Sequence, residues 1–397
     1  GVALPHALMA SPSCALMNPS ELTERQAFLV LNALPNIGPI TLNRLLAELG
    51  GDPRAVLGAD QRRLEAAKGV GPAISGAIAQ WREHFDLARE EARMAQSGAM
   101  FIAGQDAGYP KWLKEIHDPP IGLYRKGSYE FDAPCIAIVG SRRTPLYGQG
   151  GARKLGAELA RLGFCVVSGL ARGIDTAAHE GALSVGGKTA AVLGTGIDLV
   201  YPPENLELYR KIEAAGAVLS EFPFGRRADR QSFAMRNRIV AGMSEAVVVV
   251  ESDVNGGAMI TARFAGEQGR LIFAVPGRID QNTSAGCHQL IRDGATLLTS
   301  VEDILAELNY LDGLRPAAIA GGPAADDDAA AGERAAGGLT PVESAVLAQF
   351  AGGTLLTADA LTAATGLAAA EVSAALMMLE LKRCVVKRAD GSFEARG

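Results

Sequence analysis

Residues 136–142 decide the fold, and they read IAIVGSR. The first four are apolar with no polar alternation, which is typical of a strand buried on both faces of a sheet. Gly140 ends the run, and a helix is predicted over 145–162. The same order recurs in FCVVS at 164–168, followed by a glycine loop and a helix predicted over 174–185. Two strand–loop–helix units in succession predict a parallel sheet between two layers of helices.

Four further apolar runs extend this pattern. They lie at 189–193, 217–219, 246–251 and 271–275, and helical segments separate most of them. Six such strands are enough for one large doubly wound domain. We therefore predict the α/β class, with a Rossmann-like parallel sheet as the core domain over 99–312.

The segments on either side of this core differ from it in composition and in predicted secondary structure. Residues 20–98 predict short helices joined by glycine hairpins at 35–39 and 68–72, whose following helices begin with N–H groups free to meet a phosphate. Residues 313–338 are mostly Ala and Gly and predict a flexible linker. Residues 339–397 predict a winged helix: a Thr340–Glu343 capping box, a helix over 369–381 and a hairpin. Residues 1–19 are expected to be a disordered leader.

Composition narrows the function classes. The net charge of −6 excludes a uniformly basic nucleic-acid coat, so DNA contact requires a local basic patch. The 5 cysteines are far apart and form no C-x-x-C pair, so no metal site or disulfide framework is indicated. No apolar stretch is long enough to span a membrane. The opening segment has no basic region before an apolar core, so we expect no secretion signal and a cytoplasmic location.

Three glycine loops follow predicted strands, where parallel sheets bind ligands. They supply Gly140, Ser141 and Arg142 after the first strand; Ser168, Gly169 and Arg172 after the second; and Gly256, Gly257 and Thr261 after the run ending at 251. Backbone N–H groups at the helix starts favour anions, whereas the dinucleotide fingerprint G-x-G-x-x-G is missing. Several such loops on one sheet predict a broad anion-binding rim, which suits a polymer of phosphates.

An arginine-rich stretch adds to this rim. Residues 225–238 hold five arginines and one acidic residue. Guanidinium groups pair with phosphate oxygens and stack on bases, and an aromatic ring offers a further stacking surface. The candidate DNA-binding residues here are Arg226, Arg227, Phe233, Arg236, Asn237 and Arg238.

Asp175 and His179 lie four residues apart on one predicted helix, which raises the question of a metal or acid–base pair. Two ligands without a third are weak evidence for a metal site, so we interpret both residues as groups that form local hydrogen bonds. No nucleophile elbow is found. We therefore predict no catalytic residues, no metal and no cofactor.

Taken together, these motifs resemble one family, the DNA processing protein A (DprA/Smf) proteins. The resemblance rests on the runs at 138–142 and 167–175, with Ala178-His179, and on later motifs in family order: GTGID at 194–198, Tyr201-Pro202, Asn205, Ser220-Glu221, RNRI at 236–239, ITA at 260–262 and VPG at 275–277. It implies an extended Rossmann fold that binds single-stranded DNA, forms a homodimer and loads RecA recombinase during natural transformation or recombination. It also implies a SAM-like (helix-hairpin-helix) N-terminal domain and DNA contacts by Arg142, Arg226 and Arg227.

Two departures from the family pattern concern the loops. Phe233-Ala234 stands where a proline usually follows the phenylalanine, and Asn255-Gly256-Gly257 stands where a serine-rich loop is usual. The loop backbone can still bind a phosphate, whereas the side-chain contacts of those serines are missing from this sequence.

Two alternative functions stay open. The first is a nucleotide-processing enzyme of the lysine-decarboxylase-like phosphoribohydrolase group, but the P-G-G-x-G-T motif of that group is missing. The second is a double-stranded-DNA regulator, but the helix at 369–381 is poor in Lys and Arg, which favours protein contact. However, this domain has four basic residues in and next to its hairpin, so DNA stays an alternative ligand for it. They are Lys382, Arg383, Lys387 and Arg388. An apolar neighbourhood of Met243, Val247, Ile260 and Leu271 could be either dimer interface or core.

Overall fold

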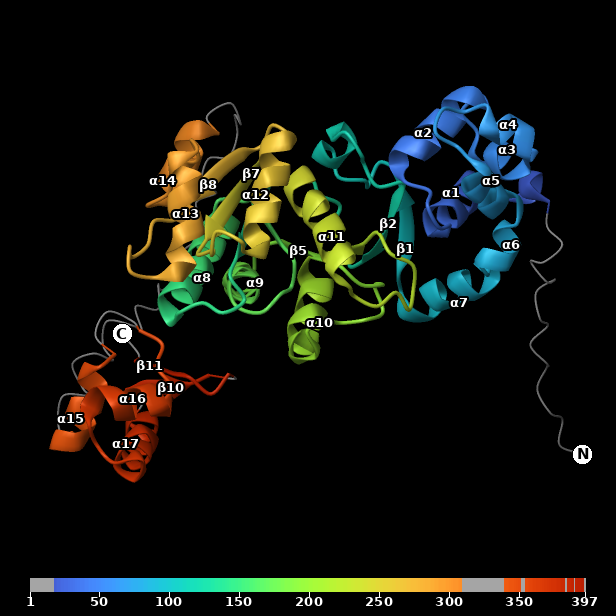
Figure 1. The fold of residues 1–397 in the computed structure, drawn as a ribbon. Helices are drawn as coiled ribbons and strands as arrows, with labels where there is room; N and C mark the ends of the chain where they lie inside the picture. The colour runs from blue at the N-terminus through green and yellow to red at the C-terminus, as the bar shows by residue number, and fades with distance from the viewer. Residues whose placement is uncertain (1–17, 309–338, 351–353, 383, 389, 396–397) are drawn as a thin grey trace, which may run out of the picture.

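The computed structural model describes residues 18–308, 339–350, 354–382, 384–388 and 390–395. The predicted linker and almost all of the expected leader lie outside these residues, as does Cys14. Within them, a nine-stranded sheet forms the centre of the molecule (Figure 1). N-terminal helices lie beyond one edge of the sheet, and a small C-terminal unit lies below the opposite end (Figure 1).

The sheet has the order β1-β2-β6-β5-β4-β3-β7-β8-β9. All six predicted strands are present, as β3 to β8, and they pair in parallel. The edge strand β1 and its neighbour β2 are antiparallel additions that the sequence pattern did not indicate. The bounds are β1 Met100–Ala103, β2 Gly122–Lys126, β3 Cys135–Gly140, β4 Cys165–Ser168, β5 Thr189–Leu193, β6 Ala217–Ser220, β7 Ala246–Val250, β8 Leu271–Ala274 and β9 Thr296–Leu297.

Helices cover both faces because the strands are apolar on both. One core joins Ile136 and Val248 of the sheet to α8 and α9, and the other joins Ala137 and Val247 to α11 and α12. The Rossmann-like prediction is therefore confirmed. The helices of the Rossmann-like domain are α8 Leu146–Arg161, α9 Ile174–Ser184, α10 Leu206–Ala215, α11 Arg230–Gly242, α12 Gly257–Glu267, α13 Asn282–Arg292 and α14 Val301–Glu307.

The N-terminal helices share their core with the sheet edge. Leu29 and Trp81 belong to the same buried cluster as Tyr124 of β2 and Phe224. The Glu90 carboxylate of α7 accepts hydrogen bonds from Tyr124 Oη at 2.8 Å and from the Phe224 backbone N–H at 2.9 Å. These contacts hold the helices firmly against β2. Their bounds are α1 Glu24–Ala33, α2 Pro39–Glu48, α3 Pro53–Gly58, α4 Gln61–Glu65, α5 Pro72–Ala79, α6 Trp81–His84 and α7 Leu87–Ser97.

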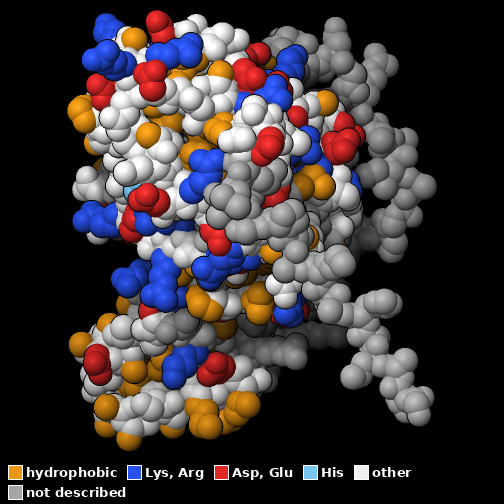
Figure 2. Space-filling view, turned by 90° about the vertical axis from the view of Figure 1, so that its right-hand side faces the viewer, with side chains coloured by type: hydrophobic (Ala, Val, Ile, Leu, Met, Phe, Trp, Pro, Cys, Tyr) orange, Lys and Arg blue, Asp and Glu red, His pale blue; other side chains and the backbone are white. Residues whose placement is uncertain are grey.

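The C-terminal unit is a winged helix with its own small core. It consists of α15 Pro341–Ala348, α16 Ala358–Thr365, α17 Ala369–Leu381 and the hairpin of β10 Val385–Lys387 and β11 Phe393–Ala395. The predicted capping box is present, with Thr340 Oγ1 accepting from the Glu343 N–H at 3.2 Å. Apolar side chains gather at the lower end of this unit (Figure 2). Among the residues of α17, Met377, Met378 and Leu381 are exposed.

Among the helices of the described residues, no single one is long and apolar enough to cross a bilayer. The helices α16 and α17 reach the length and apolar content of a membrane span only when taken together, and the chain bends by 116° between them. Their apolar residues Leu361, Val372 and Leu379 are buried in the winged-helix core.

The apolar neighbourhood considered as a dimer surface is largely internal. Met243 and Val247 are almost fully buried, and Leu271 packs against a core cluster. Ile260 instead lines a groove described below.

Candidate nucleic-acid interface

A groove lies at the topological switch of the sheet. The chain leaves β3 toward β4 on one side and later returns to place β7 on the other side of β3. The loops after β3 and β7 therefore diverge, and they leave a crevice beyond the carboxyl ends of these two strands. A groove of about 430 Å³ occupies this crevice.

The groove is basic in its lining. Four arginines line it against two aspartates, although the chain as a whole has a net charge of −6. Figure 2 shows Lys and Arg side chains gathered in a band across the middle of the molecule, above the C-terminal unit. The lining residues are Val139, Gly140, Ser141, Arg142, Arg143, Ala171, Asp175, Arg230, Phe233, Ala234, Arg236, Asn237, Ser252, Asp253, Gly256, Gly257, Ala258, Ile260 and Thr261.

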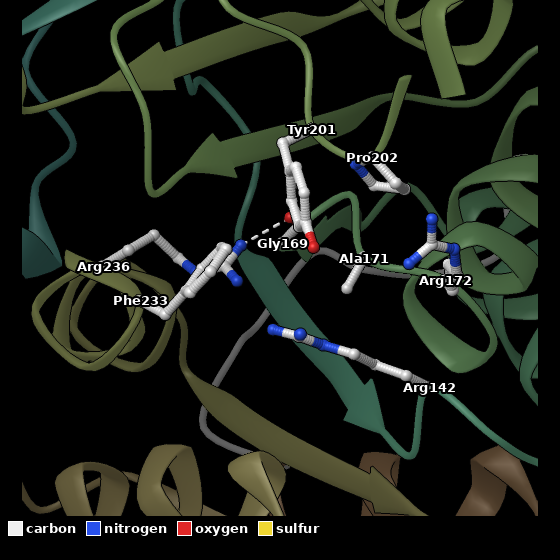
Figure 3. Close-up of a pocket in the computed structure, with 8 residues that line it drawn as sticks. All are labelled: Arg142, Gly169, Ala171, Arg172, Tyr201, Pro202, Phe233 and Arg236. Carbon is white, nitrogen blue, oxygen red and sulfur yellow. Dashed lines mark hydrogen bonds between the residues drawn. The ribbon is translucent and has the colours of Figure 1, made fainter. Parts of the chain in front are cut away.

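A smaller pocket adjoins the groove and is closed by stacked side chains (Figure 3). The Arg142 guanidinium lies over the Phe233 ring at 4.9 Å from its centroid, and the Tyr201 ring lies 5.6 Å away on a tilt of 48°. The remaining volume is about 10 Å³, which is room for one water molecule. A nucleobase can therefore stack on Phe233 only where Arg142 or Tyr201 moves aside. The lining residues are Arg142, Gly169, Ala171, Arg172, Tyr201, Pro202, Phe233 and Arg236.

Arg236 forms the floor shared by pocket and groove. Its side chain is buried, and Nη1 donates hydrogen bonds to the carbonyl oxygens of Gly169 and Val192. Burial lowers the pKa of Arg236 to about 10, and the charge of Asp175 opposes this shift. The guanidinium is thus still protonated near neutral pH and supplies a fixed positive charge beneath the rim.

The loop after β4 is held in one conformation by Asp175. Its carboxylate accepts the N–H groups of Gly169 at 3.1 Å and Ala171 at 3.4 Å. Leu170 between them has φ of 58°, a left-handed conformation that is uncommon for a leucine. A buried carboxylate and a fully buried Leu170 together fix this backbone, so the loop is preorganised before any ligand binds.

His179 has a local structural role, as expected. Its Nδ1 is 2.7 Å from the Thr189 hydroxyl, and the side chain is buried. Burial, with a smaller contribution from the Arg236 charge, lowers the pKa of His179 to about 3, so the imidazole is neutral at physiological pH. In the described part of the chain, no group of three metal-ligating side chains is found. The interpretation of Asp175 and His179 as local hydrogen-bonding groups is confirmed.

The loop after β7 presents the start of α12 to the groove. Gly256 is the N-cap and provides no side chain for capping, so the first N–H groups of α12 remain available to an anion. Asn237 Nδ2 donates to the Gly257 carbonyl at 3.3 Å, and this contact joins α11 to the loop. Thr261 is almost fully buried beneath it. The rim here is thus built from backbone and not from hydroxyl groups.

Several predicted residues lie away from the groove centre. Ser168 is buried, and its hydroxyl donates to the Ile138 carbonyl at 2.6 Å. Arg172 lines only the small pocket and forms an ion pair with Glu204. Arg226 is exposed and paired with Asp229 at 2.6 Å, and Arg227 is exposed beside it. These two arginines precede α11, whose side chains line the groove.

Arg238 was predicted to contact DNA, but the structure places its side chain in the protein interior. Its side chain is 5% exposed and forms ion pairs with Glu221 and Asp118, and it lines neither the pocket nor the groove. Burial of Glu221 raises the pKa of that carboxyl, and the Arg238 charge opposes the shift. The helical period explains the difference: Arg236 and Arg238 are two residues apart on α11 and cannot point to the same side.

Sequence reasoning missed other lining residues. Arg143 and Arg230 line the groove, and Tyr201 lines the pocket. Arg143 adjoins Arg142, and Arg230 stands inside the arginine-rich stretch, so proximity in sequence was the available signal. Tyr201 reaches Phe233 only through the tertiary fold.

Comparison with known proteins agrees with this architecture. The family model described as DNA recombination-mediator protein A matches residues 100–309, and the DprA winged helix domain model matches residues 329–391. Protein Smf of Synechocystis sp. is 36% identical over 299 residues, which is 73% of this chain and 74% of that protein.

The chain belongs to the DNA recombination-mediator protein A family.

Two further relatives of this family are similar. DNA processing protein DprA of Streptococcus pneumoniae is 44% identical over 206 residues, covering 52% of this chain and 73% of that protein. The X-ray structure of DprA from the same organism superposes with a TM-score of 0.61 at 34% identity, covering 73% of this chain and 98% of that chain. The family resemblance and the Rossmann-like and winged-helix parts of the fold prediction are thereby confirmed.

Proposed function

We propose that the groove between β3 and β7 binds single-stranded DNA. The observation that carries the proposal is the placement of four arginines, an uncapped helix start and the half-buried Phe233 ring at the switch point of a sheet in an acidic chain. Membership of a DNA recombination-mediator family supports it.

Phosphates are expected along the two rims of the groove. Arg142 and Arg143 stand on the β3 side, and the N–H groups at the start of α12 stand opposite. Guanidinium groups and helix N-termini both favour oxyanions, and neither reads a base sequence. The proposed binding is therefore independent of sequence.

Bases are expected to stack on Phe233. Its ring already carries the Arg142 guanidinium on one side, and a base that replaces this cation would gain a stacking contact of about 1–3 kcal/mol. The displaced Arg142 would then be free to pair with a phosphate. A paired duplex cannot splay its bases into such a pocket, which favours single strands over double strands.

The test is a fluorescence anisotropy titration of labelled oligo-dT with Arg142→Ala. We expect at least a tenfold loss of affinity, and a plot of log K against log salt that is shallower by about 0.7 for each phosphate contact removed. Arg161→Ala is the matched control, because Arg161 is exposed at the other end of α8, roughly 24 Å along the helix axis. Equal losses in both variants, or none in either, would remove the site assignment.

The hydrogen bonds of Asp175 and His179 favour a site that binds a ligand without catalysing a reaction. Asp175 is occupied by backbone N–H groups, and His179 by Thr189. The alternative, a nucleotide phosphoribohydrolase, requires turnover of a substrate such as AMP. Release of free base from AMP by the wild-type chain, abolished in a groove variant, would favour the enzyme instead.

We further propose that the chain acts as a cytoplasmic homodimer that protects incoming single strands and loads RecA on them during transformation or recombination. This follows from the family and the proposed ligand. Light scattering coupled to size exclusion measures the dimer. RecA-dependent ATP hydrolysis on single strands precoated with a single-strand-binding protein measures loading, and an unchanged lag time with the chain present would contradict it.

A further inference from the structure

A buried carboxylate of the C-terminal winged helix contacts the main domain. Glu394 of β11 is 1% exposed, and its Oε1 accepts a hydrogen bond from the backbone N–H of Leu146 at the start of α8. The two residues are 248 positions apart in sequence. Figure 1 shows the C-terminal unit close below α8.

Glu394 serves as the N-cap that α8 lacks within its own domain. The N-cap residue Pro145 makes no side-chain capping bond, and the first turn of α8 has no acidic residue. A helix of 16 residues carries a partial positive charge at this end. A carboxylate from the winged helix therefore supplies the oxyanion that this helix start favours.

The hairpin holds the carboxylate in place with an arginine. Glu394 Oε2 accepts a hydrogen bond from Arg388 Nη1 at 2.9 Å, and the Arg388 side chain is only 15% exposed. Glu251 of the main domain lies near Glu394 and Arg388, and its carboxylate accepts a hydrogen bond from the Thr144 hydroxyl. Burial, together with the nearby Glu394 charge, raises the pKa of Glu251. The carboxylates of Glu394 and Glu251 therefore share the charge of one arginine, Arg388.

This contact lies next to the groove, within three residues of its lining along the chain. Arg143 and Ser252 line the groove, and Thr144 and Glu251 adjoin them in the chain. The loop from Gly140 to Pro145 leads directly from the groove to the start of α8. A DNA strand that continues past Arg143 would meet the N–H group that Glu394 occupies.

We propose that the β10–β11 hairpin blocks the path of DNA next to the groove, and that the Glu394 carboxylate and a DNA phosphate compete for the start of α8. The closed state limits the strand to the groove. Release of the winged helix extends the binding path and frees the winged helix for another contact. This inference rests on the groove as the DNA site.

Affinity for DNA provides the first test, on the full-length chain. Glu394→Gln removes the charge of the carboxylate, so the hairpin should release and labelled oligo-dT should bind about three- to tenfold more tightly. Glu380→Gln is the matched control, because Glu380 is an exposed acid on α17 of the same winged helix and the charge change is the same. Equal affinity of the two variants, or weaker binding by Glu394→Gln, would overturn the proposal.

The position of the winged helix provides a second test that needs no DNA. Fluorescent dyes are placed by Lys154→Cys on α8 and Ser373→Cys on α17, both exposed positions. Cys14→Ser removes the one native cysteine outside the described residues, and the other four are buried. Energy transfer should fall with Glu394→Gln and also when oligo-dT binds the wild-type chain. Transfer unchanged in both cases would overturn the proposal.

The two tests separate this inference from the function on which it rests. If Arg142→Ala weakens DNA binding while Glu394→Gln leaves affinity and energy transfer unchanged, the groove stands and the competition fails. If the wild-type chain does not bind oligo-dT, the proposed function itself fails, and the loss of energy transfer in Glu394→Gln then reports only domain docking without competition.

Discussion

The Arg236 guanidinium passes directly over Gly169 and donates a hydrogen bond to its carbonyl oxygen (Figure 3). A Cβ atom on residue 169 would lie 1.8 Å from Nη1 of Arg236. Glycine at this position is therefore a requirement of the arginine, which in turn forms the floor of both the pocket and the groove.

Gly169→Ala should consequently destabilise the protein and displace Arg236. Forcing an atom into a packed site costs about 1–3 kcal/mol of unfolding free energy. Denaturant unfolding measures this loss, and oligo-dT affinity should fall as well. Gly150→Ala is the control, because Gly150 is exposed on α8 and a Cβ there meets nothing within 4 Å. A fully stable Gly169→Ala chain would show that the close approach is relaxed in solution.

Arg238 should behave as a structural residue and not as a DNA contact. Arg238→Ala leaves the buried Glu221 carboxylate without its arginine, which costs about 3–5 kcal/mol of stability. Arg227→Ala, at an exposed site, should leave stability unchanged within about 0.5 kcal/mol while weakening oligo-dT binding. Thermal and denaturant unfolding of both variants, paired with anisotropy titrations, separate the two roles. A stable Arg238→Ala chain that binds DNA poorly would reverse this assignment.

His179 should make stability depend on pH below neutrality. Its pKa is about 3 in the folded protein and 6.5 in the unfolded chain, so the unfolded state binds more protons between these values. Above pH 6.5 the imidazole is neutral in both states and does not affect stability. As the pH falls below 6.5, the free energy of unfolding decreases, and the loss reaches about 2 kcal/mol at pH 5. Unfolding of the wild type and of His179→Asn at several pH values measures the difference. His84→Asn, at an exposed position, is the control and should keep the wild-type slope.

The sequence predicted the fold wherever local pattern and tertiary environment agree. The runs that became β3 to β8 are apolar throughout because helices cover both of their faces, so composition alone reveals them. β2 did not show this pattern, since it ends in Arg125 and Lys126 and pairs antiparallel with β6. Its position depends on the N-terminal helices, whose Glu90 and Leu29 pack around Tyr124, and such a contact leaves no periodic signal.

The site was predictable as a set of loops but not as an arrangement of side chains. Glycine after a strand indicated the anion rim, and the switch between β3 and β7 placed Arg142 and Gly257 across one groove. Which arginines face that groove depends on helix rotation, and this sends Arg236 to the floor and Arg238 into the core. The Tyr201–Phe233 contact depends on a loop after β5 meeting α11, which no spacing indicates.

Phe233 offers a direct probe of base stacking in the groove. Phe233→Leu keeps an apolar side chain but removes the π-face, so oligo-dT affinity should fall by about 1–3 kcal/mol, roughly five- to 150-fold. Phe233→Tyr keeps the ring and should bind within about threefold of the wild type. The Gly194 backbone lies against this ring, and a Cβ there would approach it to 2.9 Å, so bulkier replacements are less suitable.

The same substitution separates stacking from charge through its salt dependence. Phe233→Leu removes no cation, so the slope of log K against log salt should match that of the wild type, whereas Arg142→Ala should make it shallower. Titrations at four salt concentrations measure both slopes. A Phe233→Leu chain with wild-type affinity would place the bases elsewhere, and one with a shallower slope would show that the ring acts only by positioning the Arg142 guanidinium stacked on it.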